Sequence, residues 1–310
     1  MRAAFISALI DLARNDESIF LLVGDVGYSL VEPYAQEFPQ RFVNIGIAEQ
    51  NMTGIATGLA LCGKNVFVYS IANFPIMRCV EQIRNDICYH NANVKIVTAG
   101  GGLVYGPLGT THHVTEDLAI MRALPSMTVI APGDPVEAAL ATRATAEWLG
   151  PCYLRLGRTK DPQVHQATPD FQIGKALKLC EGKNVTLIAS GGLLYNTVQA
   201  AQQLAQHGIE ARVLSMHTIK PLDKMAVLSA AEETNAIVTV EEHNIIGGLG
   251  SAVAEVLSEE DNLNVAFRRM GLPDEFCTQV GSQECLRKVY SLSVEGIVSS
   301  VKQLMEGRKN

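Results

Sequence analysis

An acidic residue within an apolar segment is the most informative chemical feature of the sequence. Glu49 lies in the stretch NIGIAEQNMTGIATGLA, where small and apolar residues surround it. A carboxyl group removed from water in such surroundings favours its protonated form, which can donate a hydrogen bond at neutral pH. The segment therefore predicts an acid–base residue whose partner is a basic ring nitrogen.

Three further polar features follow apolar runs that have the length of strands. Asp25 follows the run IFLLV, the loop from Tyr69 to Phe74 follows the run VFV, and the glycine-rich loop GGGLVYGPLGTTHH ends in His112 and His113. Taken singly, each feature and Glu49 have an ordinary explanation, such as a loop cap, a first-turn acid or a surface histidine. Ligands of open α/β sheets bind beyond the carboxyl ends of the strands, however, and all four features are expected there. Their convergence favours an active site.

The elements that must position these residues follow from the apolar pattern. Short apolar runs alternate with longer amphipathic stretches, which is typical of parallel sheets wrapped by helices. The segment Gly157 to Gly174 is polar, contains two prolines and lacks clear periodicity, so it is interpreted as a linker. The sequence therefore predicts the α/β class, with two doubly wound domains at residues 1–160 and 175–310. Strands are expected at 19–23, 66–69, 94–98, 128–131, 185–189, 211–215 and 236–240.

Composition excludes several classes of protein. Of the 310 residues, 47% are hydrophobic and 18% charged, so a disordered or fibrous chain is excluded. The net charge is −7 and no basic run occurs, so we expect no nucleic-acid partner. The apolar runs are far shorter than the roughly 20 residues that span a membrane, so no membrane association is expected.

Cysteine and histidine spacing bears on location and metals. The seven cysteines form no CxxC pair, and most lie in apolar segments, so we interpret them as free thiols of a cytoplasmic protein. The seven histidines show no metal-ligand spacing. We therefore expect no metal ligand in this chain.

Longer segments of the sequence resemble a known family. The segment RFVNIGIAEQNMTGIATGLALCGKNVFVYS resembles the pyrimidine-binding domain of transketolases and deoxyxylulose phosphate synthases, which use thiamine diphosphate. The segments GTTHHVTEDLAIMRALPSMTVIAPGD and VTVEEHNIIGGLGSAVAEVL are similar to the rest of that domain and to the transketolase C-terminal domain. The resemblance covers nearly the whole chain in order. It implies a pyrimidine-binding domain at 1–160 and a transketolase-type C-terminal domain at 175–310.

The resemblance also implies roles for individual residues. Glu49 matches the glutamate that hydrogen-bonds the aminopyrimidine ring of the cofactor, and Asp25 matches an aspartate near the thiazolium ring. Phe74 is the nearest aromatic residue for packing on the pyrimidine. His112 matches the histidine of the GPTH motif that faces the substrate. Neighbouring side chains rarely point the same way, so His113 is expected to face elsewhere.

Substrate binding is implied in the same way. Arg2, Ser29 and Arg155 align by spacing with residues that hold the phosphate of the acceptor sugar, and arginine suits such bidentate contacts. Each also has a structural alternative, as a terminal, turn or structural residue. Transketolases place an aspartate four residues before the substrate histidine, where this chain has Leu108. Leucine cannot accept a hydrogen bond, which favours a less hydroxylated, more apolar or modified acceptor.

The magnesium-binding half of the family is missing from the sequence. Full-length transketolases carry a GDG motif and a later asparagine that help hold Mg²⁺, and neither Gly24-Asp25-Val26 nor Gly133-Asp134-Pro135 matches them. The resemblance therefore implies the C-terminal subunit of a split transketolase. We expect a partner N-terminal subunit that holds most of the Mg²⁺ site, in an α2β2 assembly. The helix after Glu49 is the candidate contact surface, and Glu241 to His243 are interpreted as interface or structural residues.

The preferred function is transfer of a two-carbon ketol unit from a ketose or ketose phosphate to an aldehyde or sugar acceptor. Two alternatives are the beta subunit of a 2-oxoacid dehydrogenase and an acyl transferase like deoxyxylulose phosphate synthase. A third is a non-catalytic assembly subunit. The GTTHH loop followed by TEDLAIMRALP favours the transketolase, and the combination of Asp25, Glu49 and His112 favours an enzyme.

Overall fold

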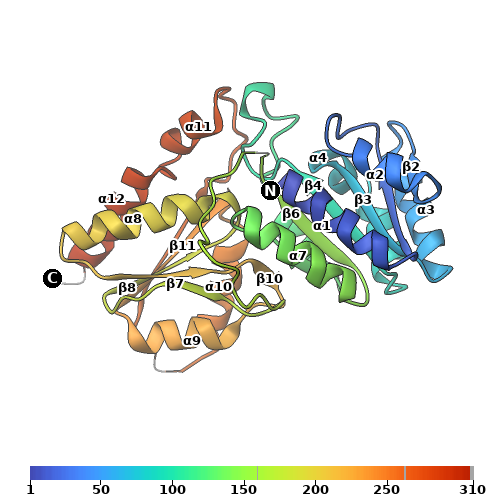
Figure 1. Ribbon diagram of the computed structural model, residues 1–310. Coiled ribbons are helices and arrows are strands. Elements are labelled where there is room, and N and C mark those ends of the chain that lie inside the picture. The colour runs from blue at the N-terminus through green and yellow to red at the C-terminus, as the bar shows by residue number, and fades with distance from the viewer. Residues whose placement is uncertain (159, 262, 308–310) are drawn as a thin grey trace.

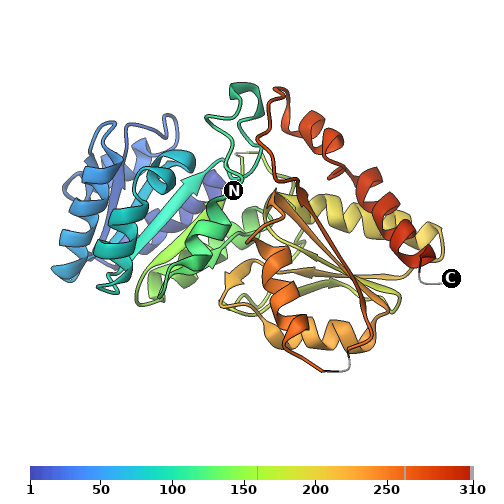
Figure 2. The same ribbon diagram turned by 180° about the vertical axis from the view of Figure 1, so that it is seen from behind.

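The computed structural model describes residues 1–158, 160–261 and 263–307. It contains two α/β units, each built on its own sheet, which lie side by side (Figures 1 and 2). The fold class predicted from the alternation of apolar runs is therefore confirmed.

The first sheet has seven strands in the order β10-β5-β6-β4-β3-β1-β2. They are β1 (Ile19–Val23), β2 (Phe42–Asn44), β3 (Asn65–Ile71), β4 (Val94–Ala99), β5 (Thr128–Ile130), β6 (Cys152–Leu156) and β10 (Thr218–Lys220). All neighbours pair in parallel except β10 and β5. Strand β10 is not predicted from the sequence, because three residues carry too little periodicity. This strand comes from the second half of the chain and joins it to the first sheet.

Helices cover both faces of the first sheet. On one face α1 (Arg2–Asn15) packs beside α7 (Pro135–Glu147), and Phe5 and Leu9 of α1 are fully buried (Figure 1). The remaining helices of this unit are α2 (Glu32–Glu37), α3 (Glu49–Leu61), α4 (Asn73–Met77), α5 (Val80–Gln82) and α6 (Asp117–Ala123). The parallel strands β1, β3 and β4 end at one edge of the sheet, which positions the loops discussed below.

The second sheet has five strands in the order β12-β11-β8-β9-β7. They are β7 (Leu177–Cys180), β8 (Val185–Ala189), β9 (Ala211–Ser215), β11 (Ala236–Asn244) and β12 (Ala266–Leu272). The helices are α8 (Leu194–Gln206), α9 (Lys224–Glu233), α10 (Leu249–Ser258), α11 (Gln283–Val289) and α12 (Val294–Glu306). The edge strands β7 and β12 are only partly buried, so their sequences lack the continuous apolar run that predicts the inner strands.

The two units share an apolar core. One cluster of buried side chains contains Leu22 and Ile96 of the first sheet together with Ile188 and Leu214 of the second. The described residues between 157 and 174 form neither a helix nor a strand, as expected of a linker. The continuous core therefore packs the two units against each other despite the irregular connection.

Two findings bear on membranes and redox state. Within the part of the chain that the structure describes, every helix is too short or too polar to cross a membrane. All seven cysteines are free thiols.

Candidate active site

Four loops meet at the edge of the first sheet where its parallel strands end. Asp25 follows β1, Glu49 begins α3 after β2, Phe74 lies in α4 after β3, and His112 lies in the loop after β4. Neighbouring parallel strands end at the same edge, so the order of the strands brings these loops together.

Glu49 has one paired and one unpaired carboxylate oxygen. Its side chain is 2% exposed, and Oε2 accepts a hydrogen bond of 2.8 Å from Arg78 Nη1. Oε1 is buried and has no hydrogen-bond partner within residues 1–158, 160–261 and 263–307. A side chain at Gly24 would come within 3.7 Å of Oε1, so the glycine borders the free oxygen. A buried oxygen without a hydrogen-bond partner is costly, which marks this point as one where a ligand supplies the partner.

Phe74 connects Glu49 to the histidine loop. The Arg78 guanidinium carbon lies 4.7 Å from the Phe74 ring centroid, which is a cation–π contact. The Phe74 and His112 ring centroids are 5.6 Å apart and their planes are inclined by 72°. Glu49, Arg78, Phe74 and His112 therefore form a continuous chain of contacts. From the sequence, Arg78 is recognised only as a neighbour of Phe74, because spacing does not reveal its ion pair.

The two adjacent histidines lie in different environments. His112 is partly exposed, and its Nδ1 lies 3.0 Å from Thr111 Oγ1. His113 is only 4% exposed and its Nε2 lies 3.3 Å from the Gly106 carbonyl. This difference agrees with the expectation that the two side chains face different ways.

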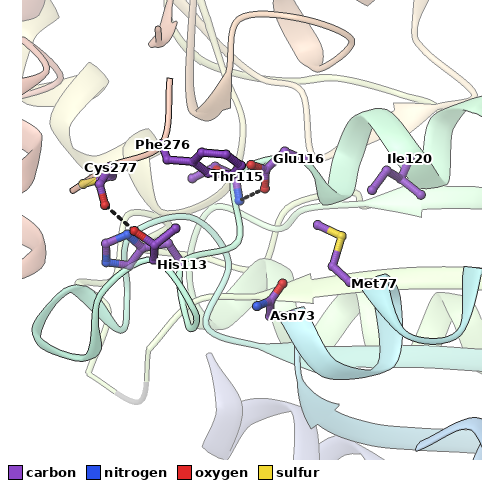
Figure 3. Close-up of a pocket in the computed structure, with 9 residues that line it drawn as sticks. Asn73, Met77, His113, Thr115, Glu116, Ile120, Phe276 and Cys277 are labelled. Atoms are coloured by element: carbon purple, nitrogen blue, oxygen red, sulfur yellow. Dashed lines mark hydrogen bonds between the residues drawn. The ribbon is translucent and has the colours of Figure 1, made fainter. Parts of the chain in front are cut away.

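A cavity of about 390 Å³ lies beside this loop (Figure 3). Asn73 and His113, which adjoin Phe74 and His112 in sequence, contribute to its wall, and Phe276 and Cys277 close it from the C-terminal half of the chain. The other lining residues are Met77, Thr110, Thr115, Glu116 and Ile120. The cavity is not predicted from the sequence, because it forms between segments that are distant along the chain.

Asp25 is held in a fixed orientation at the end of β1. Its Oδ1 accepts a hydrogen bond of 3.0 Å from Asn44 Nδ2, and its backbone N–H donates one of 3.1 Å to Asn44 Oδ1. Its φ of 55° is in the left-handed region, which is unfavourable for a residue with a side chain. Such strain is often found at functional sites. Asn44 is thus a supporting residue that no pattern in the sequence identifies.

The three residues expected at a sugar phosphate lie in different environments. Ser29 is exposed, and its backbone N–H donates to Glu32 Oε1 at 2.8 Å, so a carboxylate already occupies the position. Arg2 lies beside Tyr69. Burial raises the pKa of Tyr69 to about 12, although the positive charge of Arg2 lowers it. Arg2 Nε is buried without a hydrogen-bond partner.

Arg155, which is predicted to contact a phosphate, makes buried structural contacts in this conformation. Its side chain is 6% exposed, and its Nε lies 2.8 Å from Oδ2 of the fully buried Asp117. Its terminal nitrogen also donates to the carbonyls of Val114 and Glu242, at 2.7 and 3.1 Å. Burial opposes its charge, but the Asp117 carboxylate keeps the Arg155 pKa above its ordinary value. These buried contacts occupy the guanidinium group, and little of it is open to a ligand.

A second arginine of the same segment is accessible. Arg158 has 36% of its side chain exposed and pairs with Glu284 at 2.5 Å. The amino group of Met1 donates to the Arg158 carbonyl at 3.1 Å, so the residue lies beside the start of α1. The only sequence signal for it is the repeated arginine in the run RLGR.

Comparisons with known families agree with this arrangement. The transketolase pyrimidine-binding domain matches residues 1–163, and the transketolase C-terminal domain matches residues 174–297. Together the two matches cover nearly the whole chain.

Relatives of the same length carry the names of transketolase subunits. The chain is 40% identical over 307 residues to a subunit of the apulose-4-phosphate transketolase of Phocaeicola vulgatus, covering 98% of this chain and 97% of that protein. It is 38% identical to a subunit of the 6-deoxy-6-sulfo-D-fructose transketolase of a Clostridium species, covering 100% and 95%. It is 35% identical to the 1-deoxy-D-xylulose-5-phosphate synthase of Heliobacterium modesticaldum, of which it covers only 47%.

Solved structures give the same result. A split-gene transketolase, described as an inactive beta4 tetramer, has a TM-score of 0.91, 40% identity and 98% coverage of both chains. Transketolase of Pichia stipitis has a TM-score of 0.83 at 20% identity, which shows the fold, and the chain covers 46% of it. The chain therefore belongs to the transketolase family, as the C-terminal subunit of a split transketolase-like transferase.

Proposed function

We propose that this chain supplies the pyrimidine side of a thiamine diphosphate site in an enzyme that transfers a two-carbon ketol unit between sugars. The unpaired, buried Oε1 of Glu49 is the observation that carries this proposal. A carboxyl oxygen beside a glycine and near an aromatic ring suits a nitrogen heterocycle that offers one hydrogen-bonding edge. The family implies thiamine diphosphate as that ligand.

The residues present fit the pyrimidine end of the cofactor. When bound, thiamine diphosphate supplies the carbanion chemistry of the reaction. Glu49 would hold a proton at Oε1 toward the ring nitrogen, while Arg78 fixes the other oxygen. Phe74 would pack against the pyrimidine, and Asp25 would lie toward the thiazolium ring.

His112 would contact the substrate, and the adjacent loop would limit its chemistry. Leu108 lies in the same loop, is 56% exposed and cannot accept a hydrogen bond. Relatives with substrate names belong to transketolases for apulose 4-phosphate and 6-deoxy-6-sulfo-D-fructose. We therefore propose a modified sugar that carries an anionic group. Among the arginines considered for that group, Arg158 is 36% exposed and Arg2 is half-buried, whereas Arg155 is only 6% exposed.

A partner N-terminal subunit would complete the site. Among the described residues, no group of three or more histidine, cysteine, aspartate or glutamate side chains could hold a metal ion. We propose that the partner holds Mg²⁺ and the diphosphate group. The outer face of α3 is a candidate contact surface, because added side chains at Gly54 and Gly58 would meet nothing within 4 Å and Leu61 is 62% exposed. An α2β2 assembly remains our expectation.

We also propose that the enzyme is cytoplasmic. Seven free thiols without a disulfide are typical of a reducing compartment.

The proposal is tested by isolating the complex and assaying it. Native mass spectrometry with thiamine diphosphate and Mg²⁺ is expected to detect this chain with a second subunit and the cofactor. The complex should then transfer a ketol unit from a ketose phosphate to an aldose without decarboxylating pyruvate. Pyruvate-dependent activity would favour the 2-oxoacid dehydrogenase or synthase alternatives. A complex that binds no cofactor would favour the non-catalytic alternative.

A further inference from the structure

We propose that Glu242, in the C-terminal unit, is a positioning residue for the loop that carries His112. The C-terminal unit would then take part in the substrate side of the site without contributing a reacting group. The functional consequence rests on the role proposed above for His112, whereas the structural part can be tested without it.

The base of the loop is closed by its own backbone and fixed by Glu242. Gly102 and Val114 exchange two hydrogen bonds, of 2.8 and 2.9 Å, which close the loop between them. The next backbone N–H, that of Leu103, donates to Glu242 Oε1 at 2.7 Å. A Cβ atom at Gly102 would come within 2.5 Å of the same oxygen. The loop therefore requires a glycine there so that the carboxylate of a distant strand can reach its backbone.

The Glu242 carboxylate is itself held rigidly. It is 4% exposed, and Oε1 also accepts a hydrogen bond of 2.7 Å from Gln283 Nε2. Oε2 pairs with Arg287 Nε. The backbone carbonyl of Glu242 accepts from Arg155, the residue buried beside Asp117. Side chains of α11 and β6 thus hold Glu242 in place independently of its contact with the loop.

Two further contacts tie the loop to the same unit. The Leu103 side chain is fully buried in the cluster that contains Leu187 and Leu286 of the C-terminal unit. Near the other end of the loop, Thr110 Oγ1 donates to the Cys277 carbonyl at 2.6 Å, at the wall of the cavity in Figure 3. The loop is therefore attached to the C-terminal unit on both sides of its tip.

Stability alone does not explain a buried carboxylate at this position. Replacing a buried ion pair by packed apolar residues is often neutral or stabilising, because desolvation offsets the Coulombic gain. A directional acceptor does what an apolar side chain cannot, since it fixes the Leu103 N–H at one point. His112 lies nine residues further along this loop and contacts Phe74, so the position of the loop sets the position of its ring.

The structural part is tested by hydrogen–deuterium exchange on the full chain. Glu242→Gln keeps the shape but presents an NH₂ group either to Arg287 Nε or to the two donors at Oε1, Leu103 N–H and Gln283 Nε2. We expect the amides of residues 103–113 to exchange roughly 10-fold faster, since the buried acceptor of the Leu103 N–H is weakened or lost. Glu241→Gln is the matched control. The Glu241 carboxylate is also buried, but it accepts hydrogen bonds of 2.7 Å from the N–H groups of Leu249 and Gly250 rather than from the loop. Equal exchange of the loop in both variants would overturn the proposal.

The functional part is tested in the complex with the partner subunit. Glu242→Gln and the milder Thr110→Val, which removes only the hydroxyl donor, should raise KM for the ketose or lower kcat by about 10-fold. The dissociation constant for thiamine diphosphate should stay unchanged, because Glu49 lies on α3. A parallel loss of cofactor affinity would indicate general destabilisation and contradict positioning. If the wild-type complex lacks ketol transfer, the proposed function fails, while loop exchange still decides the role of Glu242.

Discussion

Arg78 Nη1 lies 2.8 Å from Glu49 Oε2, while the other oxygen of this buried carboxyl group has no partner among the residues that the structure describes. The ion pair thus fixes the orientation of the group and leaves one oxygen free to face a ligand. Arg78 also contacts the Phe74 ring, so the residue that fixes the acid also fixes the aromatic surface beside it.

Substitution of Glu49 should reduce turnover while leaving the fold intact. Loss of a positioned acid–base group typically costs 10²–10⁴-fold in rate, so we expect a loss of roughly that size in Glu49→Ala and in the isosteric Glu49→Gln. Steady-state assays of the complex, with circular dichroism and native mass spectrometry as controls for folding and assembly, provide the measurement. Unchanged turnover would contradict the mechanism proposed for Glu49.

Removal of Arg78 should destabilise the chain and weaken cofactor binding. In Arg78→Met the buried Glu49 carboxylate loses the hydrogen bond from Arg78, which should cost about 1–3 kcal/mol in the free energy of unfolding. Arg78→Lys should recover part of the loss through its charge. The exposed Arg84, whose side chain donates to Asn85 Oδ1, gives the matched control Arg84→Met, expected to change stability little. Equal effects of the Arg78→Met and Arg84→Met substitutions in denaturant unfolding would refute the importance of the ion pair.

The two arginines of the segment 155–158 should respond differently to substitution by methionine. Arg155→Met leaves the buried Asp117 without a cation, so a loss of about 3–5 kcal/mol is expected. Arg158→Met should change stability by less than about 1 kcal/mol, because its pair with Glu284 is exposed and its contact with Asp161 is long, at 3.9 Å. It should instead raise KM for an anionic sugar by roughly 10-fold if it binds the anionic group. A stable Arg155→Met variant with a raised KM would restore the phosphate role predicted from the sequence.

The pH dependence of stability should reveal Glu241. Burial raises the pKa of this carboxyl group to about 7 from an ordinary value of 4.5, although two backbone N–H groups work against the shift. Between these values the folded chain binds more protons than the unfolded chain, so this group lowers stability as the pH rises. Burial lowers the pKa of the neighbouring His243 to about 4 from an ordinary value of 6.5. Between these two values the unfolded chain binds more protons, so His243 makes the chain more stable as the pH rises.

Glu241→Gln removes the contribution of Glu241 to the pH dependence of stability and leaves that of His243. The stability of the variant relative to wild type should therefore rise from about pH 4.5 to about pH 7, and urea unfolding across this range measures it. Parallel curves for the two proteins would show that Glu241 does not titrate in this window.

The sequence by itself determined the class of fold and the edge of the sheet where the site lies. Apolar runs of strand length, such as Ile19–Val23, and amphipathic helices are local patterns, because side-chain periodicity depends on the backbone conformation of each segment. Once the first sheet is parallel, the positions of Asp25, Glu49, Phe74 and His112 after their strands follow from the chain order. The segment GIAEQN likewise indicated the family without any tertiary information.

Only the tertiary structure decided how these residues are supported. Leu103 and Glu242 are 139 residues apart in sequence, Arg155 and Asp117 are 38 apart, and Arg78 and Glu49 are 29 apart. Contacts at such separations depend on how helices and loops pack across the two units, and no local periodicity encodes them. For the same reason, spacing alone assigned Arg155 to a phosphate, whereas packing buried it beside Asp117.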